Sequence, residues 1–275
     1  MYTQLQQRGS DHPPVTLNTL AQMCEAGDKI ACLTAYDASF AALVDAAGVD
    51  VVLVGDSLGM VIQGHDTTVP VTMDQMVYHS ESVARGLQHA FLVTDLPFAS
   101  YTSRDQALTN SVRLMQEGGA RMVKLESGAS QLEIVEYLGS HDIAVCAHLG
   151  LKPQSVHKTG GFRVQGREEQ AAARMVDDAR ALEAAGADIL LLECIPAALG
   201  QQITHSVHVP VIGIGAGPDT DGQILVLYDV LNITAGRKPR FVRNFMEGAA
   251  DCGAAVAGYV AAVRSGDYPA PEHCF

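Results

Sequence analysis

The sequence contains no tryptophan, and aromatic residues make up 5% of its 275 residues. Its apolar residues are therefore mostly valine, isoleucine, leucine and alanine, which build the cores of parallel α/β folds. No apolar run approaches the ~20 residues of a membrane-spanning helix. Residues 1–14 contain no apolar stretch of the kind that a signal peptide needs. These absences predict a cytoplasmic protein without a membrane partner.

Cysteine is scarce, and none of the six cysteines belongs to a Cys-x-x-Cys pair. Cys32, Cys146 and Cys194 lie within or just after apolar runs, where a free cysteine behaves as a small hydrophobic residue. This pattern argues against a disulfide framework and against a structural zinc site. It favours a protein of a reducing compartment.

Basic residues are also few, since 18 Lys and Arg oppose 31 Asp and Glu and the formal net charge is -13. A chain this acidic is a poor partner for nucleic acid or for an anionic membrane surface. An anionic small molecule remains a possible substrate, because a local lysine or a bound metal reverses the field at a single site.

Short apolar runs alternate with helical patterns along the chain, and no linker or internal repeat interrupts them. Such alternation predicts a parallel sheet with right-handed crossovers. Eight units in a chain of this length favour a single-domain (βα)₈ TIM barrel at residues 15–275, after a loose N-terminal segment at residues 1–14. An open doubly wound sheet is the alternative. The expected strands are 30–36, 51–54, 91–95, 122–126, 143–148, 188–193, 209–213 and 224–227.

Helix start signals fall between these strands. Asp37 can cap the helix that follows it, and Thr72-x-x-Gln75 and Ser103-x-x-Gln106 match the capping-box pattern. The connection at residues 149–168 is long for a compact domain, and loops of this length are often functional. The expected helices are 16–26, the segment from Asp37 to Gly48, the segments from Thr72 to Gly86 and from Ser103 to Gly118, a segment through Ile134 and Tyr137, 168–185 and 241–263.

Acidic residues stand at the ends of three successive strands. Asp56 follows the run Val51–Val54 and a glycine, and Asp95 and Glu126 end the next two strands. Because the carboxyl ends of barrel strands share one mouth, we expect these acids to meet there. Oxygen ligands of this kind suit Mg²⁺, so we predict Asp56, Asp95 and Glu126 as metal ligands. The alternative is that Asp56 and Asp95 merely cap helices.

Lys124 lies two residues before Glu126, so both side chains point to the same face of a strand. Lys124 has three possible roles: it binds a substrate carboxylate, forms a Schiff base, or pairs structurally with Glu126. The neighbouring acids keep its amine protonated, which favours the carboxylate-binding role.

His148 and Glu193 end two later apolar strands. For His148, a role in the site and a role as a satisfied core residue are equally supported by the spacing. Glu193 follows three leucines, a setting that raises the pKa of a carboxyl group and suits a general base. The alternative for Glu193 is a salt bridge with Arg163 or Arg167.

A set of motifs in order resembles the ketopantoate hydroxymethyltransferase family, from about residue 17 to residue 265. Lys152 departs from the family's usual threonine. The motifs are Leu33-Thr-Ala-Tyr-Asp37, Val54-Gly-Asp-Ser-Leu-Gly-Met60, Gln63-Gly-His-Asp-Thr-Thr68, Asp95-Leu-Pro-Phe98, Val123-Lys-Leu-Glu126, His148-Leu-Gly-Leu-Lys-Pro-Gln-Ser155, Gly160-Gly-Phe-Arg-Val-Gln-Gly-Arg167, Leu192-Glu-Cys-Ile-Pro196, Val211-Ile-Gly-Ile-Gly-Ala-Gly217 and Asp221-Gly-Gln-Ile-Leu225.

The resemblance implies a barrel enzyme that transfers a hydroxymethyl group from 5,10-methylenetetrahydrofolate to 3-methyl-2-oxobutanoate, giving ketopantoate for pantothenate and coenzyme A synthesis. It implies one Mg²⁺ per subunit and a homodecamer of two pentameric rings. By position it assigns Asp56, Asp95 and Glu126 to the metal site, and Glu193 as the proton acceptor. It assigns the binding of the oxo acid to Ser57, Lys124 and His148, with Asp56 and Asp95 beside them.

Two other functions compete with this expectation. A magnesium-dependent carbon–carbon lyase of the isocitrate lyase type would share the barrel and the acids, but the Lys-Lys-Cys-Gly-His stretch of such lyases is absent from the sequence. A catalytically silent barrel that serves as a scaffold is the second alternative, and the intact set of acids with Lys124 argues against it.

Overall fold

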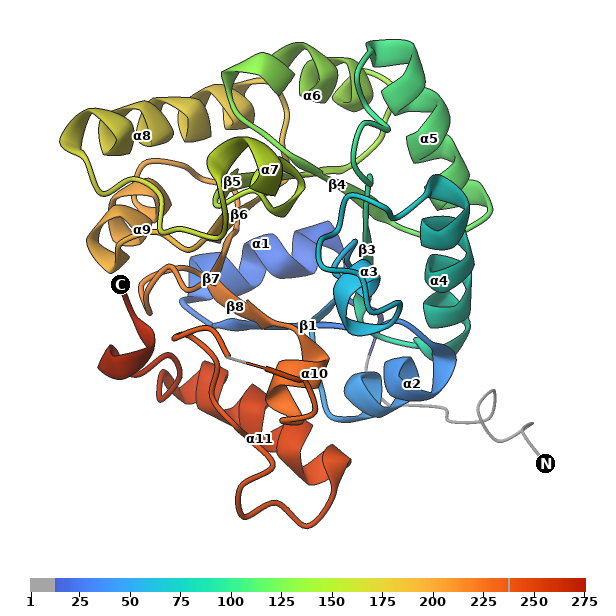
Figure 1. Cartoon of the computed structure of the whole chain (residues 1–275), viewed down its shortest axis with the longest axis vertical. Coiled ribbons are helices and arrows are strands. Elements are labelled where there is room, and N and C mark those ends of the chain that lie inside the picture. Colours follow the sequence, from blue (N-terminus) through green and yellow to red (C-terminus); the bar gives the residue numbers. More distant parts are fainter. Residues whose placement is uncertain (1–12, 237) are drawn as a thin grey trace.

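The structure, a computed structural model, describes residues 13–236 and 238–275, so most of the predicted N-terminal segment lies outside the described residues. Eight parallel strands close into a barrel in chain order, and the last strand pairs with the first. Figure 1 shows the helices arranged around this ring of strands. The predicted (βα)₈ barrel is therefore confirmed, and the open sheet is excluded.

All eight predicted strands form, and the middle ones coincide with the prediction. The first strand ends two residues earlier than predicted, and the later strands are displaced by one to two residues at one or both ends. The strands are β1 (Ile30–Thr34), β2 (Val51–Val54), β3 (Phe91–Asp95), β4 (Met122–Glu126), β5 (Val145–Gly150), β6 (Ile189–Glu193), β7 (Val211–Ile214) and β8 (Gly222–Leu225).

Long and short helices connect the strands. The α-helices are α1 (Leu17–Ala26), α2 (Ala38–Ala46), α3 (Leu58–Val61), α4 (Met73–Gly86), α5 (Arg104–Gln116), α6 (Leu132–Gly139), α7 (Val156–Thr159), α8 (Glu169–Ala184), α9 (Ala197–Thr204), α10 (Leu227–Val230) and α11 (Cys252–Ser265). The 3₁₀ turns are η2 (Ala129–Gln131), η3 (Pro153–Ser155) and η4 (Pro271–His273).

The predicted helix caps explain where several helices begin. The Asp37 carboxylate accepts the N–H groups of the first turn of α2, and Thr72 forms a complete capping box with Gln75 at α4. At α5, Ser103 accepts the N–H of Gln106, but the Gln106 side chain turns to the residue before the cap. The second capping box therefore forms only in part.

The helix predicted at residues 241–263 is wrong in its first half. The chain from 241 to 250 forms turns, and α11 begins at Cys252 because the Asp251 side chain accepts the N–H of Ala254 at 2.8 Å. Phe241 and Phe245 have helix-like spacing, but both pack as buried turn residues. The long connection predicted at residues 149–168 contains the 3₁₀ turn η3 and the short helix α7.

The core has two layers because strand side chains alternate between the barrel interior and the helices. One layer lies between strands and helices, and the other fills the barrel. Leu20 of α1 belongs to the inner layer, so α1 closes one end of the barrel, and Figure 1 shows it lying across the ring. The inner layer consists of Leu20, Ile30, Cys32, Val51, Leu53, Phe91, Val93, Met122, Cys146, Ile189, Leu191, Ile212 and Ile224.

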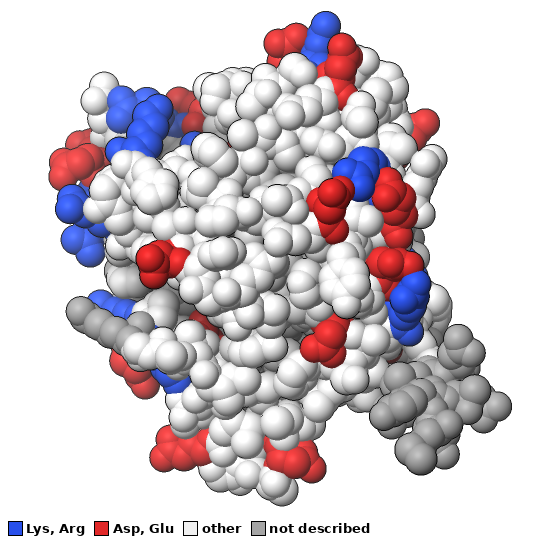
Figure 2. Space-filling view, turned by 45° about the vertical axis from the view of Figure 1, so that its right-hand side comes forward, with Lys and Arg blue, Asp and Glu red and all other residues white. Residues whose placement is uncertain are grey.

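The surface carries no broad charged patch on the face that Figure 2 presents. Lys and Arg side chains are scattered among Asp and Glu, and most of this face is uncharged. Among the described residues, no helix combines the length and the apolar character needed to cross a membrane.

Candidate active site

Polar side chains continue the inward-facing rows of the strands at the carboxyl end of the barrel. In β3, Asp95 follows Phe91 and Val93 at spacings of two, and the latter pair belongs to the inner core layer. The register of the paired strands places inward-facing residues of neighbouring strands beside each other around the barrel. The other polar residues that continue inward rows are Lys124 and Glu126 after Met122, His148 after Cys146, and Glu193 after Leu191.

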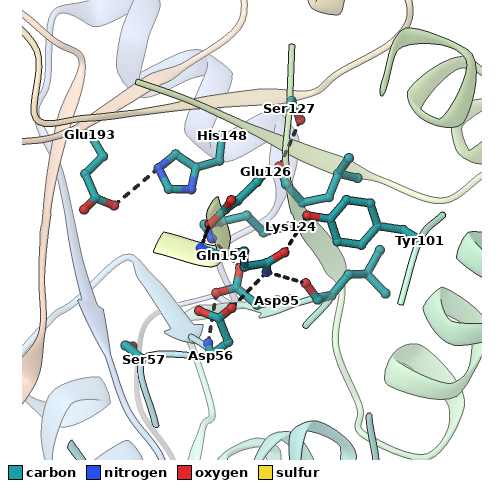
Figure 3. Close-up of polar contacts among 12 residues, drawn as sticks. Asp56, Ser57, Asp95, Tyr101, Lys124, Glu126, Ser127, His148, Gln154 and Glu193 are labelled. Atoms are coloured by element: carbon teal, nitrogen blue, oxygen red, sulfur yellow. Dashed lines mark hydrogen bonds and ion pairs between the residues drawn. The ribbon is translucent and has the colours of Figure 1, made fainter. Parts of the chain in front are cut away.

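Asp56, Asp95 and Lys124 form a buried contact at this mouth (Figure 3). The Lys124 ammonium forms an ion pair with Oδ1 of Asp95, and the backbone N–H of Asp56 donates to Oδ2 of Asp95 at 3.0 Å. Burial opposes the charge of Lys124, but the carboxylates of Asp95 and Asp56 outweigh burial and raise its pKa above the ordinary value. Lys124 is therefore an ammonium at neutral pH, as the binding of a carboxylate requires.

Burial disfavours the ionised forms of two of these acids. Burial raises the pKa of Asp56 to about 7, and the nearby Asp95 carboxylate adds to that shift. Burial also raises the pKa of Glu126 to about 8. A cation that binds between carboxyl groups crowded in this way stabilises their ionised forms.

Gln154 of η3 joins Glu126 to Asp56. Its backbone N–H donates to Oε1 of Glu126 at 2.7 Å, and its side-chain amide donates to Oδ2 of Asp56 at 2.8 Å. The hydroxyl of Tyr101 donates to the amide oxygen of Gln154 at 2.6 Å. The sequence analysis gave no role to Gln154, although it lies in the motif from His148 to Ser155, and it did not select Tyr101.

His148 and Glu193 face each other from the neighbouring strands β5 and β6. Nε2 of His148 lies 3.3 Å from Oε2 of Glu193, although the two groups are not aligned as a hydrogen bond and neither ring nitrogen has another partner among the described residues. Burial, aided by Lys124, lowers the pKa of His148 well below its ordinary value, so its ring is neutral. Burial raises the pKa of Glu193 to about 7. The predicted arginine partners, Arg163 and Arg167, are exposed, and the ion pair expected from them as an alternative does not form.

Ser57 sits beside Asp56 at the start of α3. Its hydroxyl lies 2.8 Å from the hydroxyl of the buried Tyr36, which the sequence analysis did not select. The close packing at this corner requires Gly55, since a Cβ there would come within 2.7 Å of the Ser57 Oγ and 3.5 Å of Asp95 Oδ2.

The carboxylate oxygens of the site are chemically suited to bind a divalent cation. Four carboxyl groups lie around one lysine ammonium, those of Asp56, Asp95, Glu126 and Glu193. When all four are ionised, their negative charge would exceed that of the ammonium and would repel an anionic substrate. Hard carboxylate oxygens match Mg²⁺, which commonly takes one or two carboxylates and completes its shell with water and substrate. Within residues 13–236 and 238–275, however, no three His, Cys, Asp or Glu side chains are gathered as ligands of one ion. Asp56 lies beside Asp95, whereas Glu126 is joined to Asp56 through the hydrogen bonds of Gln154.

Comparisons with known proteins agree on a single family. The family model described as ketopantoate hydroxymethyltransferase matches residues 14–271. A protein of Alkalilimnicola ehrlichii named 3-methyl-2-oxobutanoate hydroxymethyltransferase is 58% identical over 262 residues, which cover 95% of each chain. A protein of the same name from Nitrosococcus oceani is 57% identical over 258 residues, covering 94% of this chain and 98% of that one.

Two solved structures with the same fold are more distant in sequence. A 2,3-dimethylmalate lyase, described as a PEP mutase/isocitrate lyase superfamily member, aligns with a TM-score of 0.56 and 18% identity over 78% of this chain and 81% of that chain. A phosphonopyruvate hydrolase solved with oxalate and Mg²⁺ aligns with a TM-score of 0.58 and 14% identity over 77% and 81%. These likenesses concern the barrel alone, whereas the sequence matches span almost the whole chain. This protein belongs to the ketopantoate hydroxymethyltransferase family.

Proposed function

We propose that the protein is a 3-methyl-2-oxobutanoate hydroxymethyltransferase that uses 5,10-methylenetetrahydrofolate as the one-carbon donor and forms ketopantoate, which leads to pantothenate and coenzyme A. The observation that carries this proposal is the 57–58% identity to two relatives of that name along nearly their full length. The aligned lyase is 18% identical to this chain, and a likeness this distant shows a shared fold without showing a shared reaction.

We assign one Mg²⁺ per subunit to the pair Asp56 and Asp95. The mutual repulsion of the two buried carboxylates supports this assignment. Gln154 joins Glu126 to Asp56, which supports Glu126 as the third member of the metal site. When bound, the ion would supply Lewis-acid polarisation of the 2-oxo group and balance the charge of the oxo acid.

Lys124, Ser57 and His148 hold the oxo acid in this proposal. The ammonium of Lys124 supplies a charge for the substrate carboxylate, and the hydroxyl of Ser57 supplies a hydrogen bond beside Asp56. The neutral ring of His148 can donate a hydrogen bond to the substrate without adding positive charge. Figure 3 shows these side chains around one space at the barrel mouth.

Glu193 is the proton acceptor. Its carboxylate removes the proton from C3 of 3-methyl-2-oxobutanoate, which leaves an enolate whose C3 forms a bond to the methylene carbon of the folate. The carbon–nitrogen bonds of that methylene group break, water supplies the hydroxyl oxygen, and tetrahydrofolate leaves. A pKa of about 7 suits this role, since a general base works best when its pKa is near the working pH.

Family resemblance also extends the proposal to a homodecamer of two pentameric rings in the cytoplasm. All six cysteines are free thiols, as expected in a reducing compartment. Light scattering on the purified protein tests the assembly, and a mass far below ten subunits would contradict it.

Proton exchange without the donor tests the reaction directly. With Mg²⁺ and no folate, the protein should exchange the C3 proton of 3-methyl-2-oxobutanoate for deuterium in D₂O, as followed by NMR. Omission of Mg²⁺ and addition of a chelator serve as controls. If the C3 proton exchanges no faster than in buffer alone, the protein does not form the enolate and this part of the proposal is wrong.

A further inference from the structure

Gln154 is a buried glutamine whose side-chain amide and backbone N–H both reach the site. It is 7% exposed and lies in the β5–α8 connection, defined here as residues 151–168. Its backbone and its side chain each reach a carboxylate predicted to serve the metal, Glu126 and Asp56 respectively. The same side chain also donates to the backbone carbonyl of Leu96 at 3.0 Å, just after β3.

The hydrogen-bond partners determine the orientation of this amide. A backbone carbonyl such as that of Leu96 can only accept, so the NH₂ group of Gln154 must face Leu96 and Asp56. The amide oxygen then faces Tyr101, whose hydroxyl donates to it at 2.6 Å. Gln154 is therefore locked as a donor toward Asp56.

These contacts hold both the two carboxylates and the β5–α8 connection in position. Gln154 occupies Oδ2 of Asp56 and Oε1 of Glu126, which holds the second oxygen of each carboxylate in one direction. The connection is attached at both ends to the strand end that bears Glu193, because Leu151 donates to the Glu193 carbonyl at 2.8 Å and Gln165 to the Cys194 carbonyl at 2.9 Å. Figure 3 shows Gln154 reaching from this connection between Asp56, Glu126 and Tyr101.

We propose that Gln154 is a positioning residue that orients Asp56 and Glu126 for the divalent cation and thereby links ordering of the β5–α8 connection to metal binding. The inference rests on the metal site of the proposed function. Outer partners that orient metal ligands commonly change metal affinity by about 10–100-fold when they are removed.

A structural role for Gln154 predicts something different. A glutamine that only held the connection in place would change the stability of that segment, but it would not change the metal affinity of the carboxylates after β2 and at the end of β4. Metal affinity and segment protection are therefore the two quantities to measure together.

The test uses the full-length protein with Mn²⁺ as the probe. Gln154→Met keeps the side-chain length and removes the amide, and Gln165→Met is the matched control because the Gln165 amide donates to the Arg163 carbonyl and to no carboxylate. Free Mn²⁺ is measured by electron paramagnetic resonance, and amide hydrogen exchange is measured over residues 151–161. Asp56→Asn reports on the metal site itself.

We expect Gln154→Met to bind Mn²⁺ about 10–100-fold more weakly than the unmodified protein, while Gln165→Met binds as the unmodified protein does. Mn²⁺ should slow exchange over residues 151–161 in the unmodified protein and in Gln165→Met, and should fail to do so in Gln154→Met. Tyr101→Phe, which removes the hydroxyl that holds the amide oxygen, should weaken binding by less than Gln154→Met.

Three outcomes overturn the proposal and can be told apart. If Gln154→Met binds Mn²⁺ normally while Asp56→Asn does not, the positioning role is wrong and the metal site stands. If Gln154→Met loses affinity but Mn²⁺ never protects residues 151–161, the link to the connection is wrong. If neither the unmodified protein nor Asp56→Asn shows site-specific Mn²⁺ binding, the metal site of the proposed function fails, and the inference fails with it.

Discussion

The two ends of the barrel use buried acids in opposite ways. At the amino end, each of three aspartates immediately precedes an even-numbered strand and accepts a backbone N–H near the start of the strand before it. The pairs are Asp50 with Ala31 at 2.9 Å, Asp188 with Val145 at 2.8 Å, and Asp221 with Val211 at 2.8 Å. Burial raises the pKa of each aspartate, but the backbone donor opposes that shift.

At the carboxyl end, Asp95 and Glu126 also accept a backbone N–H, but the side chains of Asp56 and Glu193 accept none from the described residues. Asp56 lies beside Asp95, and Glu193 faces a neutral histidine. Burial raises the pKa of Asp56 and of Glu193 to about 7 in both cases. The comparison shows that burial alone does not mark a functional acid. What distinguishes Asp56 and Glu193 is that neither side chain accepts a backbone N–H from the described residues, so another group must balance their charge.

The largest expected effect comes from removing the proton acceptor at the carboxyl end. Glu193→Gln keeps the shape of the side chain but cannot take a proton, so deuterium exchange at C3 of 3-methyl-2-oxobutanoate should fall by about 10²–10⁴-fold. Binding of the oxo acid, measured by calorimetry with Mg²⁺, should remain. Retained exchange would assign the base elsewhere.

The matched control lies at the amino end. The Glu183 carboxylate accepts the backbone N–H groups of His208 and Val209, as the aspartates of that end do. Glu183→Gln should therefore leave exchange within about twofold of the unmodified protein. Equal losses in both variants would mean that the contrast between the two ends is not functional.

The next effect concerns metal binding. Asp56→Asn replaces a charged ligand with a neutral one, and calorimetric titration should show Mg²⁺ binding weakened by at least about tenfold. Because burial raises the pKa of Asp56, its ionised form destabilises the fold above the ordinary pKa range, so the metal-free Asn variant should melt at a higher temperature at pH 8. An unchanged Mg²⁺ titration would exclude Asp56 as a ligand.

The pH dependence of exchange gives a smaller effect. Since the pKa of Glu193 is about 7, its carboxyl group is protonated below that pH and the exchange rate should fall about tenfold per pH unit, with a plateau above pH 7. His148 should add no second step near pH 6, because its pKa is lowered well below the ordinary value. A midpoint near the ordinary glutamate value of 4.5 would show that burial does not tune this base.

Much of this arrangement could be predicted from local sequence. Apolar runs that end in an acid located β3 and β4 to the residue, and the period of two placed Lys124 and Glu126 on one face. The turn at residues 241–250 could not be predicted, because Phe241 and Phe245 have helical spacing yet pack into the core from turns. Periodicity alone does not distinguish these two ways of burying an aromatic ring.

The contacts between side chains of different helices, strands and loops could not be predicted from the sequence. The contact of Glu193 with His148, rather than with Arg163 or Arg167, follows from the pairing of β5 with β6. Gln154 reaches residues 98 and 28 positions away, and its place in the motif from His148 to Ser155 does not indicate such contacts. The acids themselves were visible in the sequence, but the groups that orient them were not.

The smallest expected effect tests the amino end of the barrel. Asp188→Ala leaves the N–H of the buried Val145 without its acceptor, and an unpaired buried donor costs about 1–3 kcal/mol of unfolding free energy. Urea unfolding should show this loss, while exchange at C3 measured well below the transition should stay unchanged. Asp188→Asn retains an acceptor oxygen and should recover most of the stability, which separates the hydrogen bond from the charge. If Asp188→Ala instead abolished exchange in a protein that remains folded, the acids of the amino end would act on the site, and the division between a structural and a catalytic end would not hold.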